Sequence, residues 1–450
     1  MTSYGSLVLL TSLLFEVLAL NNLSDTRLKV MATTASLYAL VYFLISPPPG
    51  SFMAVWPLGM NIHGLVQRCI SYLWLRSPTE LVRKEKEKEK GGEKGQKRKR
   101  VKFSGEGEEL ELDRDVPDIS VLDALDVATT FRGVGWFVKP LFLQSPCKSS
   151  AVNKHPLPRT YSHDGTFSHE NLFANMRTIN RRFEAKGLPA RGSSTSSSRI
   201  SFALSQLLSA ALRFLALDLG ITYVNKSMSS LDLDQVSIAR RLALGALMML
   251  YVRWTMDIPF RVASGLFVLA GVHTAEEWPP LFGDWQDAYT VRRFWSHTWH
   301  QGMRLIAEPP VNLFVHSVLG LQAHGHNHSQ LRYWAKVFGN FFMAFVNHAY
   351  GRILAGGDPM NDWIMFTLHP IAIWIESSLR DVAVAAGWLD SHHRSRIEIY
   401  CGYIWVAGFV SWTFLDFMDG AIRVHGNIPA LASGLIEPAF GYSFWTPLLQ

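Results

Sequence analysis

The sequence predicts an all-α membrane protein, a polytopic helical bundle of about eight to ten transmembrane helices with one long cytosolic loop. Apolar residues make up 48% of the 450 residues and charged residues only 18%. The apolar residues gather in blocks that charged loops separate, which is the distribution of membrane spans and not of an evenly patterned globular chain. The 27 Phe, 15 Trp and 13 Tyr also suit the aromatic belts at membrane interfaces.

The net charge of +6 comes from a single loop. Residues 83–102 hold eleven cations and four glutamates, a net of +7, so the rest of the chain is close to neutral. Such a run is typical of a solvated cytosolic loop, with contact to anionic lipid or a sorting signal as the alternative. We therefore expect a lipid bilayer as the surroundings and no nucleic acid as a partner.

The chain divides into three parts. Residues 1–76 hold N-terminal membrane helices, residues 77–199 form a basic, acidic and Ser-rich loop that is largely cytosolic and partly disordered, and residues 200–450 form the membrane core. Within the first part, the uncharged block at 30–46 is long enough for a span. The block at 5–20 lacks the basic start and the cleavage site of a secretory signal, so it stays in the mature protein.

The segment at 52–75 fits either a third span or a helix at the interface. Further helices are predicted at roughly 202–224, 311–321, 333–354, 363–379, 400–417 and 428–449. Apolar blocks at 242–256 and 260–272 meet at Asp257 and Pro259, and because proline breaks helices we expect a hairpin or a kinked pair there. Three carboxylates in these helices should face the interior or an interface, because they are costly against lipid: Glu308, Asp416 and Glu437.

His348 lies in the otherwise apolar stretch FFMAFVNHAYGR, at 341–352. A charged or titratable side chain at bilayer depth costs about 2.5–3.5 kcal/mol on insertion scales, so its presence indicates a function. In an apolar, water-poor cavity the neutral imidazole is favoured, and it can accept the proton of a substrate hydroxyl. From the residues alone, a hydrogen-bonded structural histidine remains the commoner alternative.

Three stretches carry distinctive motifs: WPPLFGDWQDAYTVRRFWSHTWHQ at 278–301, FRGVGW at 131–136 and NHAYGR at 347–352. Together they resemble the wax synthase-like membrane-bound O-acyltransferases. WPPLFGDWQDAYTVRRFWSHTWHQ, at 278–301, contains the Pro-Pro-Leu-Phe-Gly turn, the Arg-Phe-Trp box and the Trp-His pair of that family. FRGVGW, at 131–136, is similar to the Arg-Gly-Ile-Gly-Trp signature of its fungal members. NHAYGR, at 347–352, stands where the family has its catalytic histidine in a membrane helix.

The resemblance implies transfer of an acyl group from coenzyme A to an alcohol. His348 matches the general base, and His300 matches the second polar position, which orients a substrate or stabilises the oxyanion. Fungal members commonly acetylate terpenoid-type secondary metabolites, which implies acetyl-CoA as co-substrate, a lipophilic alcohol as acceptor, no bound cofactor and the endoplasmic reticulum as location. The acidic residue that often follows the histidine in plant members is replaced by Ala349, so the group that orients the imidazole must come from elsewhere.

Seven further residues are candidates for contact with the substrate or coenzyme A: Arg292, Arg293, Trp295, His297, Trp299, Arg304 and Asn347. The arginines fit coenzyme A phosphates and membrane anchoring equally well. Trp295 and Trp299, four residues apart on one predicted helical face, fit an aromatic belt or a wall of the substrate site. Asn347 is adjacent to His348 but faces another side of the helix.

No metal site is expected. His324, His326 and His328 form a short loop-like tract without a cysteine or carboxylate partner, and the three cysteines are far apart. A long-chain wax-ester synthase is the alternative within the same class. A membrane transporter is the alternative from another class, although the sequence shows no internal repeat. The sequence predicts no particular oligomeric state.

Overall fold

The structure is a computed structural model. It describes residues 3–50, 52–75, 81–83, 136–138, 196–228, 237–273, 275, 278, 280–300, 304–321, 329–391 and 393–425. Helices dominate these residues, which confirms the all-α prediction, and the described strands form one short antiparallel ribbon, β1 (Leu81–Arg83) with β2 (Trp136–Val138). Most of the loop at 77–199, most of the FRGVGW motif and the helix predicted at 428–449 lie outside the described residues.

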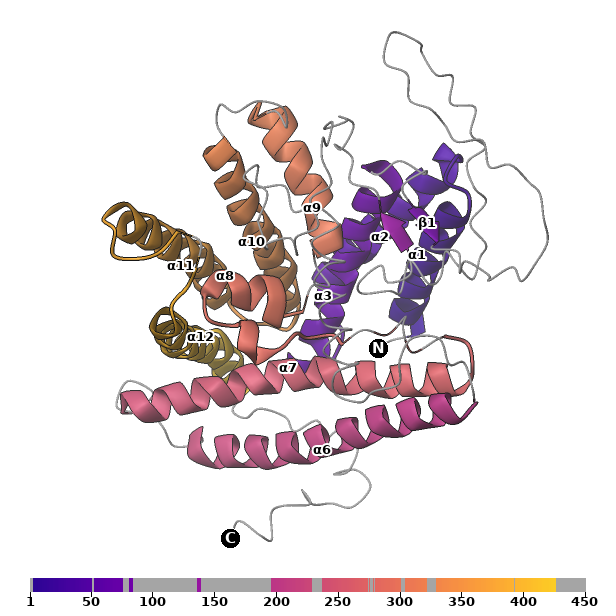
Figure 1. Cartoon of the computed structure of the whole chain (residues 1–450). Coiled ribbons are helices and arrows are strands. Elements are labelled where there is room, and N and C mark those ends of the chain that lie inside the picture. Colours follow the sequence, from indigo (N-terminus) through magenta and orange to yellow (C-terminus); the bar gives the residue numbers. More distant parts are fainter. Residues whose placement is uncertain are drawn as a thin grey trace, which may run out of the picture.

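The N-terminal part consists of three consecutive helices, shown in indigo and violet in Figure 1. They are α1 (Ser3–Asn21), α2 (Thr26–Ile45) and α3 (Phe52–Arg68), and the last continues into the π-helical turn η1 (Cys69–Trp74). The segment at 52–75 is therefore one unbroken helix, which packs against α2 and α10. A buried ion pair between Glu16 and Arg68, 2.9 Å apart, joins α1 to α3.

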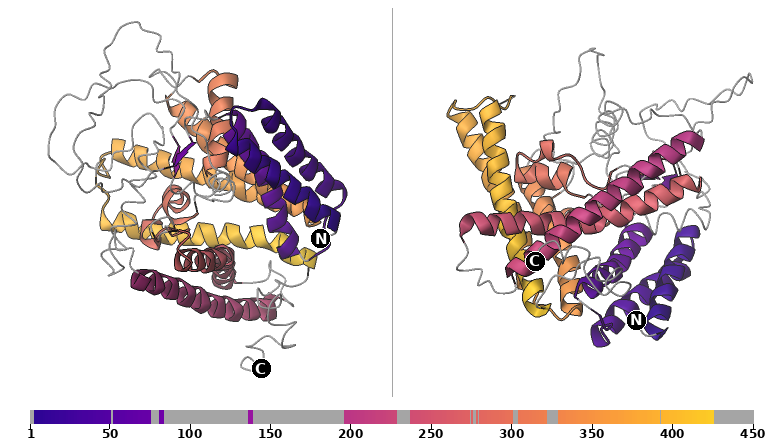
Figure 2. Two further views of the ribbon diagram at one scale, coloured as in Figure 1. Left: turned by 90° about the vertical axis from the view of Figure 1, so that its right-hand side faces the viewer. Right: turned by 90° about the horizontal axis from the view of Figure 1, so that it is seen from below.

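Two long helices, α6 (Ser196–Met228) and α7 (Ile238–Leu269), lie side by side across the other elements (Figures 1 and 2). A hairpin or a kinked pair was expected near Asp257, and the hairpin is wrong, because α7 runs through Pro259 as one helix. Packing against α6 and α12 supports the helix on both sides of the proline. Asp257 also accepts from Arg261 at 2.6 Å and from Arg213 of α6 at 3.1 Å, so the carboxylate beside Pro259 is paired at the helix interface.

The C-terminal part contains the predicted helices with shifted ends. A short segment, η5 (Trp285–Asp287), α8 (Val291–Arg293) and the π-helical turn η6 (Phe294–Thr298), precedes α9 (Arg304–Leu313) with its π-helical end η7 (Phe314–Val318), α10 (Ser329–Leu354), α11 (Met360–Ala385) and α12 (Arg396–His425). Asp416 of α12 pairs with Arg241 of α7 at 2.6 Å, an inter-helix position of the kind expected. Glu308 is half-buried in α9, and Glu437 lies outside the described residues.

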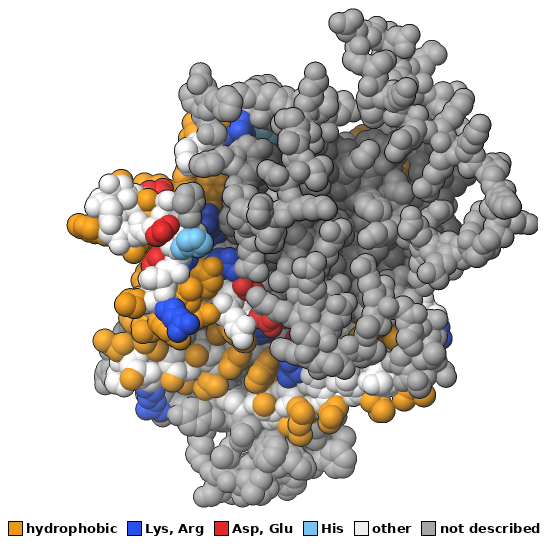
Figure 3. All heavy atoms as spheres, in the orientation of Figure 1, with side chains coloured by type: hydrophobic (Ala, Val, Ile, Leu, Met, Phe, Trp, Pro, Cys, Tyr) orange, Lys and Arg blue, Asp and Glu red, His pale blue; other side chains and the backbone are white. Residues whose placement is uncertain are grey.

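The outer faces of the helices are apolar. In the described part of the chain, four helices are long and apolar enough to cross a membrane: residues Tyr4–Asn21, Thr26–Ile45, Arg199–Asp218 and Arg396–Asp419. On α6, Leu204, Leu208 and Leu212 are 62%, 63% and 59% exposed at four-residue spacing. Figure 3 shows hydrophobic side chains along the lower edge of the molecule, over α6 and α7. A stripe of this kind is unfavourable in water and favourable in a bilayer.

Close helix contact at the centre of the molecule depends on two glycines. The Cβ of any larger residue at Gly59 of α3 would lie 2.6 Å from the Cα of Gly351 of α10, and one at Gly351 would lie 2.6 Å from the carbonyl oxygen of Trp56. Small residues let helices approach closely in membranes, where packing drives helix association. The contact brings α3 against the part of α10 that contains His348.

A buried ion pair holds the helices around this contact. The side chains of Arg352 of α10 and Asp362 of α11 are both fully buried and hydrogen-bonded to each other. Arg352 also donates to the carbonyl oxygen of Phe417 of α12 at 2.9 Å, and its guanidinium lies 5.5 Å from the ring of Trp56 of α3. One side chain of α10 thus contacts three other helices.

Replacing Arg352 with Met should destabilise the protein by about 3–5 kcal/mol, because the Asp362 carboxylate is then left buried without its cation. The double replacement Arg352→Met with Asp362→Leu should restore most of the loss. The measurement is the fraction of detergent-solubilised protein that stays monodisperse after heating. Arg380→Met is the matched control, since its pair with Glu398 is partly exposed. Equal stability of Arg352→Met and this control would contradict the assigned role.

Candidate active site

The segment at 280–300 is fixed at its centre by a carboxylate from α11. Glu376 accepts hydrogen bonds from the backbone N–H of Val291 at 2.9 and 3.1 Å and from Nε1 of Trp405 at 2.7 Å. Thr290 caps α8 by accepting from the N–H of Arg293 at 3.1 Å. The chain then forms the π-helical turn and leaves it at Trp299 in an extended conformation. Such turns are frequent at functional sites.

The Pro-Pro-Leu-Phe-Gly turn and the Arg-Phe-Trp box form one structural unit. The N–H of Gly283 donates to the carbonyl oxygen of Thr298 at 3.0 Å, and a Cβ at Gly283 would collide with the carbonyl oxygen of His297. Arg253 of α7 donates to the carbonyl oxygens of both Gly283, at 2.9 Å, and Thr298, at 3.3 Å. Its guanidinium also lies 4.6 Å from the ring of Phe282. The arginine therefore holds the turn and the box together.

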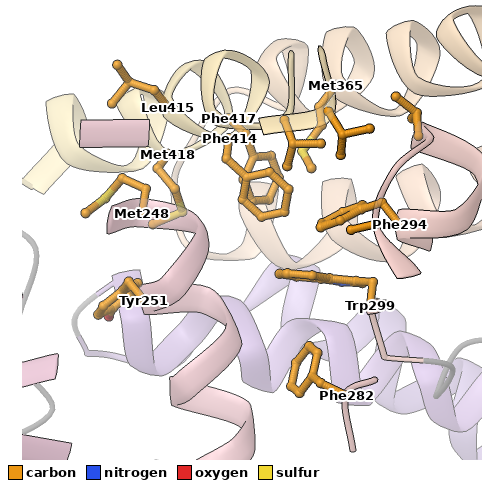
Figure 4. Packing of buried hydrophobic residues seen from close by; sticks show 14 of the residues in the cluster. Met248, Tyr251, Phe282, Phe294, Trp299, Met365, Phe414, Leu415, Phe417 and Met418 are labelled. Carbon is orange, nitrogen blue, oxygen red and sulfur yellow. The ribbon is translucent and has the colours of Figure 1, made fainter. Parts of the chain in front are cut away.

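Both tryptophans of the box point into the molecule, so the aromatic-belt interpretation is wrong. Trp299 is 4% exposed and contacts Phe282 at 5.2 Å and Phe414 of α12 at 5.1 Å between ring centroids (Figure 4). The ring of Trp295 lies 5.1 Å from that of His369 and 5.5 Å from that of Phe341. The aromatic-belt interpretation required Trp295 and Trp299 to lie on one face of a regular helix. The backbone instead forms a π-helical turn and is extended at Trp299, so the two side chains do not share such a face.

His348 lies among aromatic side chains from three other helices. Its ring is 5.7 Å from Trp56 of α3, 4.8 Å from Phe366 of α11 and 5.7 Å from Phe417 of α12. Its Nδ1 atom is shielded from solvent and has no hydrogen-bond partner among the described residues. The residue as a whole is half-buried, so the ring faces the interior without being sealed on every side.

His300 is near His348. It is close enough for an electrostatic interaction with the His348 ring. His300 itself contacts the rings of Phe282 at 5.7 Å and Trp299 at 5.8 Å and is half-buried.

The two histidines share one aromatic wall. Trp299 contacts Phe414, which lies 6.2 Å from Phe417, and Phe417 contacts His348. Figure 4 shows Trp299, Phe414 and Phe417 in this row. The structure thus brings together the two residues that the sequence selected for chemistry.

Three of the other candidate residues make hydrogen bonds to residues other than His348 and His300. The Oδ1 atom of Asn347 accepts from Nδ1 of His63 of α3 at 3.1 Å, on the different helix face that the sequence predicted. Arg293 donates to Asp287 at 2.6 Å within the same loop, and the Nδ1 atom of His297 lies 2.6 Å from Oγ of Ser296.

Two further arginines and the histidine-rich tract complete the set of candidate residues. Arg292 is half-buried, and Arg304 begins α9, although its side chain is not described. The tract with His324, His326 and His328 lies outside the described residues. Within the described part of the chain, no group of three or more His, Cys, Asp and Glu residues is arranged to hold a metal ion.

Sequence reasoning missed His369 and His63. His369 is fully buried in α11, where its Nδ1 donates to the carbonyl oxygen of Met365 at 2.8 Å and its ring packs on Trp295. His348 was selected as a titratable side chain within an apolar stretch. His369 lies within the apolar block at 363–379, so the same feature could have identified it. His63 lies in a segment whose role was left open, and its contact with Asn347 spans 284 residues of sequence.

Residues 278–369 match the family model described as the membrane bound O-acyl transferase family. The matched segment begins at Trp278, contains His300 and His348, and ends at His369. The family resemblance inferred from the motifs is thereby confirmed. Together with the apolar helices, it indicates a multi-pass membrane protein.

Three curated relatives are fungal acetyltransferases. Acetyltransferase ple2 of Rhodocybe pseudopiperita is 28% identical over 247 residues, which cover 54% of this chain and 63% of the relative. Acetyltransferase eriL of Hericium erinaceus is 27% identical over 237 residues, 50% of this chain and 58% of the relative. Acetyltransferase spyB of Aspergillus fumigatus is 27% identical over 277 residues, 54% of this chain and 45% of the relative. The chain thus spans about half the length of the curated relatives it matches. No solved structure matches this chain.

Replacing Gly283 with Ala should separate the turn from the box, because the new Cβ would meet the backbone carbonyl of His297, which cannot move aside freely. We expect faster limited proteolysis within residues 280–300, measured by mass spectrometry of the fragments. Gly408→Ala in α12 is the matched control, since a Cβ there meets no atom within 4 Å. If Gly283→Ala is cleaved at the rate of the control, the close packing assigned to this turn is wrong.

Proposed function

We propose that this protein is an O-acyltransferase that moves an acetyl group from acetyl-CoA to the hydroxyl group of a lipophilic alcohol, with His348 as the general base. The family match and the similarity to proteins named acetyltransferases support the reaction class. The observation that carries the assignment is the position of the His348 ring, inside an aromatic enclosure and near His300.

In the proposed reaction, a ring nitrogen of His348 takes the proton of the acceptor hydroxyl as its oxygen attacks the thioester carbonyl carbon. A carbon–oxygen bond forms and the carbonyl oxygen becomes an oxyanion. When the oxyanion collapses, the carbon–sulfur bond breaks and the thiolate of coenzyme A leaves. The proton held by His348 then passes to the thiolate, so the products are the ester and neutral coenzyme A thiol.

The surroundings of His348 favour one tautomer. An N–H group buried without an acceptor costs about 1–3 kcal/mol. Because Nδ1 is buried and has no partner in the described part of the chain, the tautomer with its hydrogen on Nε2 and a lone pair on Nδ1 avoids this cost.

His300 is suited to the oxyanion. It shares the aromatic wall with His348, and an imidazole N–H directed at the developing charge stabilises the transition state more than the ground state. In the proposed function the wall of Trp299, Phe414 and Phe417 excludes water from the thioester, which limits hydrolysis. The same wall suits a lipophilic, terpenoid-like secondary metabolite as acceptor. The proposal also places the enzyme in the endoplasmic reticulum membrane, as expected from the sequence.

His348→Ala should lower ester formation by about 10²–10⁴-fold, because the proton acceptor is removed. The assay incubates microsomes with labelled acetyl-CoA or palmitoyl-CoA and a panel of lipophilic alcohols, and identifies the labelled esters. His393→Ala is the matched control, because His393 is exposed. Ester formation by His348→Ala at the control rate would reject the assigned base, and flux of a solute without ester formation would indicate a transporter. Esters from palmitoyl-CoA alone would indicate a wax-ester synthase.

His300→Ala should lower kcat by about 10²–10³-fold, the usual effect of losing one oxyanion donor. His300→Asn should retain more activity than His300→Ala, because the amide N–H can still donate a hydrogen bond. Both variants are assayed with the alcohol that the wild type accepts. Equal kcat values for the Asn and Ala variants would argue against hydrogen-bond donation from this position.

A further inference from the structure

Trp56 of α3 contacts both the backbone and the ring of His348. Its side chain is 3% exposed, and its Nε1–H donates to the carbonyl oxygen of His348 at 3.3 Å. The centroids of the indole and imidazole rings are 5.7 Å apart. Trp56 belongs to none of the three motifs and lies outside the segment at 278–369 that matches the family model. An N-terminal helix thus contacts the proposed general base from outside the matched segment.

The orientation of the His348 ring depends on its neighbours. The torsion about the last bond of a histidine side chain has broad preferences, so packing decides the angle of the ring. No described residue forms a hydrogen bond with Nδ1, and Ala349 stands where an acidic residue often follows the histidine. Of the three aromatic residues around the ring, Trp56 is the one that also has a hydrogen-bond donor, and it uses this donor on the backbone of His348.

The indole of Trp56 is itself held in place. Its ring lies 5.4 Å from that of Phe417 of α12, which in turn lies 5.7 Å from that of His348. The guanidinium of Arg352 lies 5.5 Å from the indole. Because the rings of Trp56, Phe417 and His348 contact one another, a change at the indole alters the space that the imidazole occupies.

Gly351 of α10 leaves the space for the indole. A Cβ at this position would lie 2.8 Å from Cδ1 of Trp56 and 2.6 Å from its carbonyl oxygen. Glycine is an unfavourable residue in the interior of a helix. Its presence three residues after His348, in the NHAYGR motif, is accounted for by the close approach of Trp56.

A second contact from the same face of α3 fixes the two helices relative to each other. His63 follows Trp56 by seven residues, about two turns, so both lie on one face of α3. Nδ1 of His63 is hydrogen-bonded to Oδ1 of Asn347 at 3.1 Å, and its ring lies 5.9 Å from that of Tyr350. Contacts two turns apart oppose both sliding and rotation of α10 at the residues on either side of His348.

We propose that Trp56 is a positioning residue for the acyl transfer, which holds the imidazole of His348 in the orientation that meets the acceptor hydroxyl. A general base has to lie about 2.6–3.2 Å from the oxygen whose proton it takes. A displacement of about 1 Å in an active site can lower the rate by about 10²-fold. The inference rests on the proposed function, because it acts through the base assigned there.

The first test measures kcat and KM in the ester assay for detergent-solubilised, monodisperse protein. Trp56→Leu should lower kcat by about 10- to 10²-fold and leave both KM values unchanged, because Trp56 acts on the base and not on a substrate. Trp56→Phe should retain more kcat than Trp56→Leu, since a ring remains beside the imidazole. If Trp56→Leu is not monodisperse, Trp56→Phe provides the comparison with the wild type.

Trp74→Leu is the matched control. Trp74 lies on η1, the continuation of α3, and its Nε1–H also makes a hydrogen bond, to Oγ1 of Thr33 at 2.8 Å. Its side chain is half exposed, and this variant should keep the kcat of the wild type.

The second test separates positioning from general support of the fold. Trp56→Leu is combined with His348→Ala, and the residual ester formation is measured with labelled acetyl-CoA at high protein concentration. A residue that acts through the imidazole has no further effect once the imidazole is absent, so the double variant should match His348→Ala. A residue that only supports the fold should lower the residual activity by the same factor as in the wild type.

Three results would overturn the inference and leave the proposed function intact: an unchanged kcat in Trp56→Leu, a raised KM with an unchanged kcat, or an equal further loss in the His348→Ala background. Failure of the proposed function gives a different result, since His348→Ala then forms ester at the wild-type rate or the wild type forms none.

Discussion

The guanidinium of Arg352 is the contact on which the surroundings of His348 depend. It binds Asp362 of α11 and the Phe417 carbonyl of α12, and it faces Trp56 of α3. The same three helices supply the rings around His348, which lies one turn earlier on α10. A buried ion pair adds little net stability compared with apolar packing, but breaking it is costly. We infer that the pair selects one arrangement of the helices, the arrangement that encloses the imidazole.

The other side of the site is built from irregular backbone, which a membrane protein tolerates only where its polar groups are paired. Arg253 of α7 satisfies the carbonyls of Gly283 and Thr298, and Glu376 of α11 satisfies the N–H of Val291. Each partner is a charged side chain from a long helix. Rigid helices thereby fix a loop, and the loop in turn places Trp299 against Phe414 of α12 and His300 beside Trp299.

The sequence predicted most of the helices and selected His348 as a candidate, because apolar blocks and a titratable residue within them are local features; His300 was selected through the resemblance to the family. Contacts between distant segments were not predictable in this way. Pro259 was expected to interrupt a helix, but packing on α6 and α12 overrides the local preference. Trp295 was assigned to a regular helical face, whereas the chain forms a π-helical turn there. The partner of Asn347 is on α3, in a segment that no motif covers.

Polar side chains in the interior of this bundle are of two kinds. Pairs such as Glu16 with Arg68 and Arg352 with Asp362 join helices, and each charge satisfies the other. The atoms Nδ1 of His348 and Oε1 and Nε2 of Gln67 lack such partners in the described part of the chain. In a medium of low dielectric constant an unpaired polar atom is costly, so its retention has to be offset by an interaction made at another stage. For His348, we propose that the hydroxyl group of the acceptor provides that interaction during the acyl transfer.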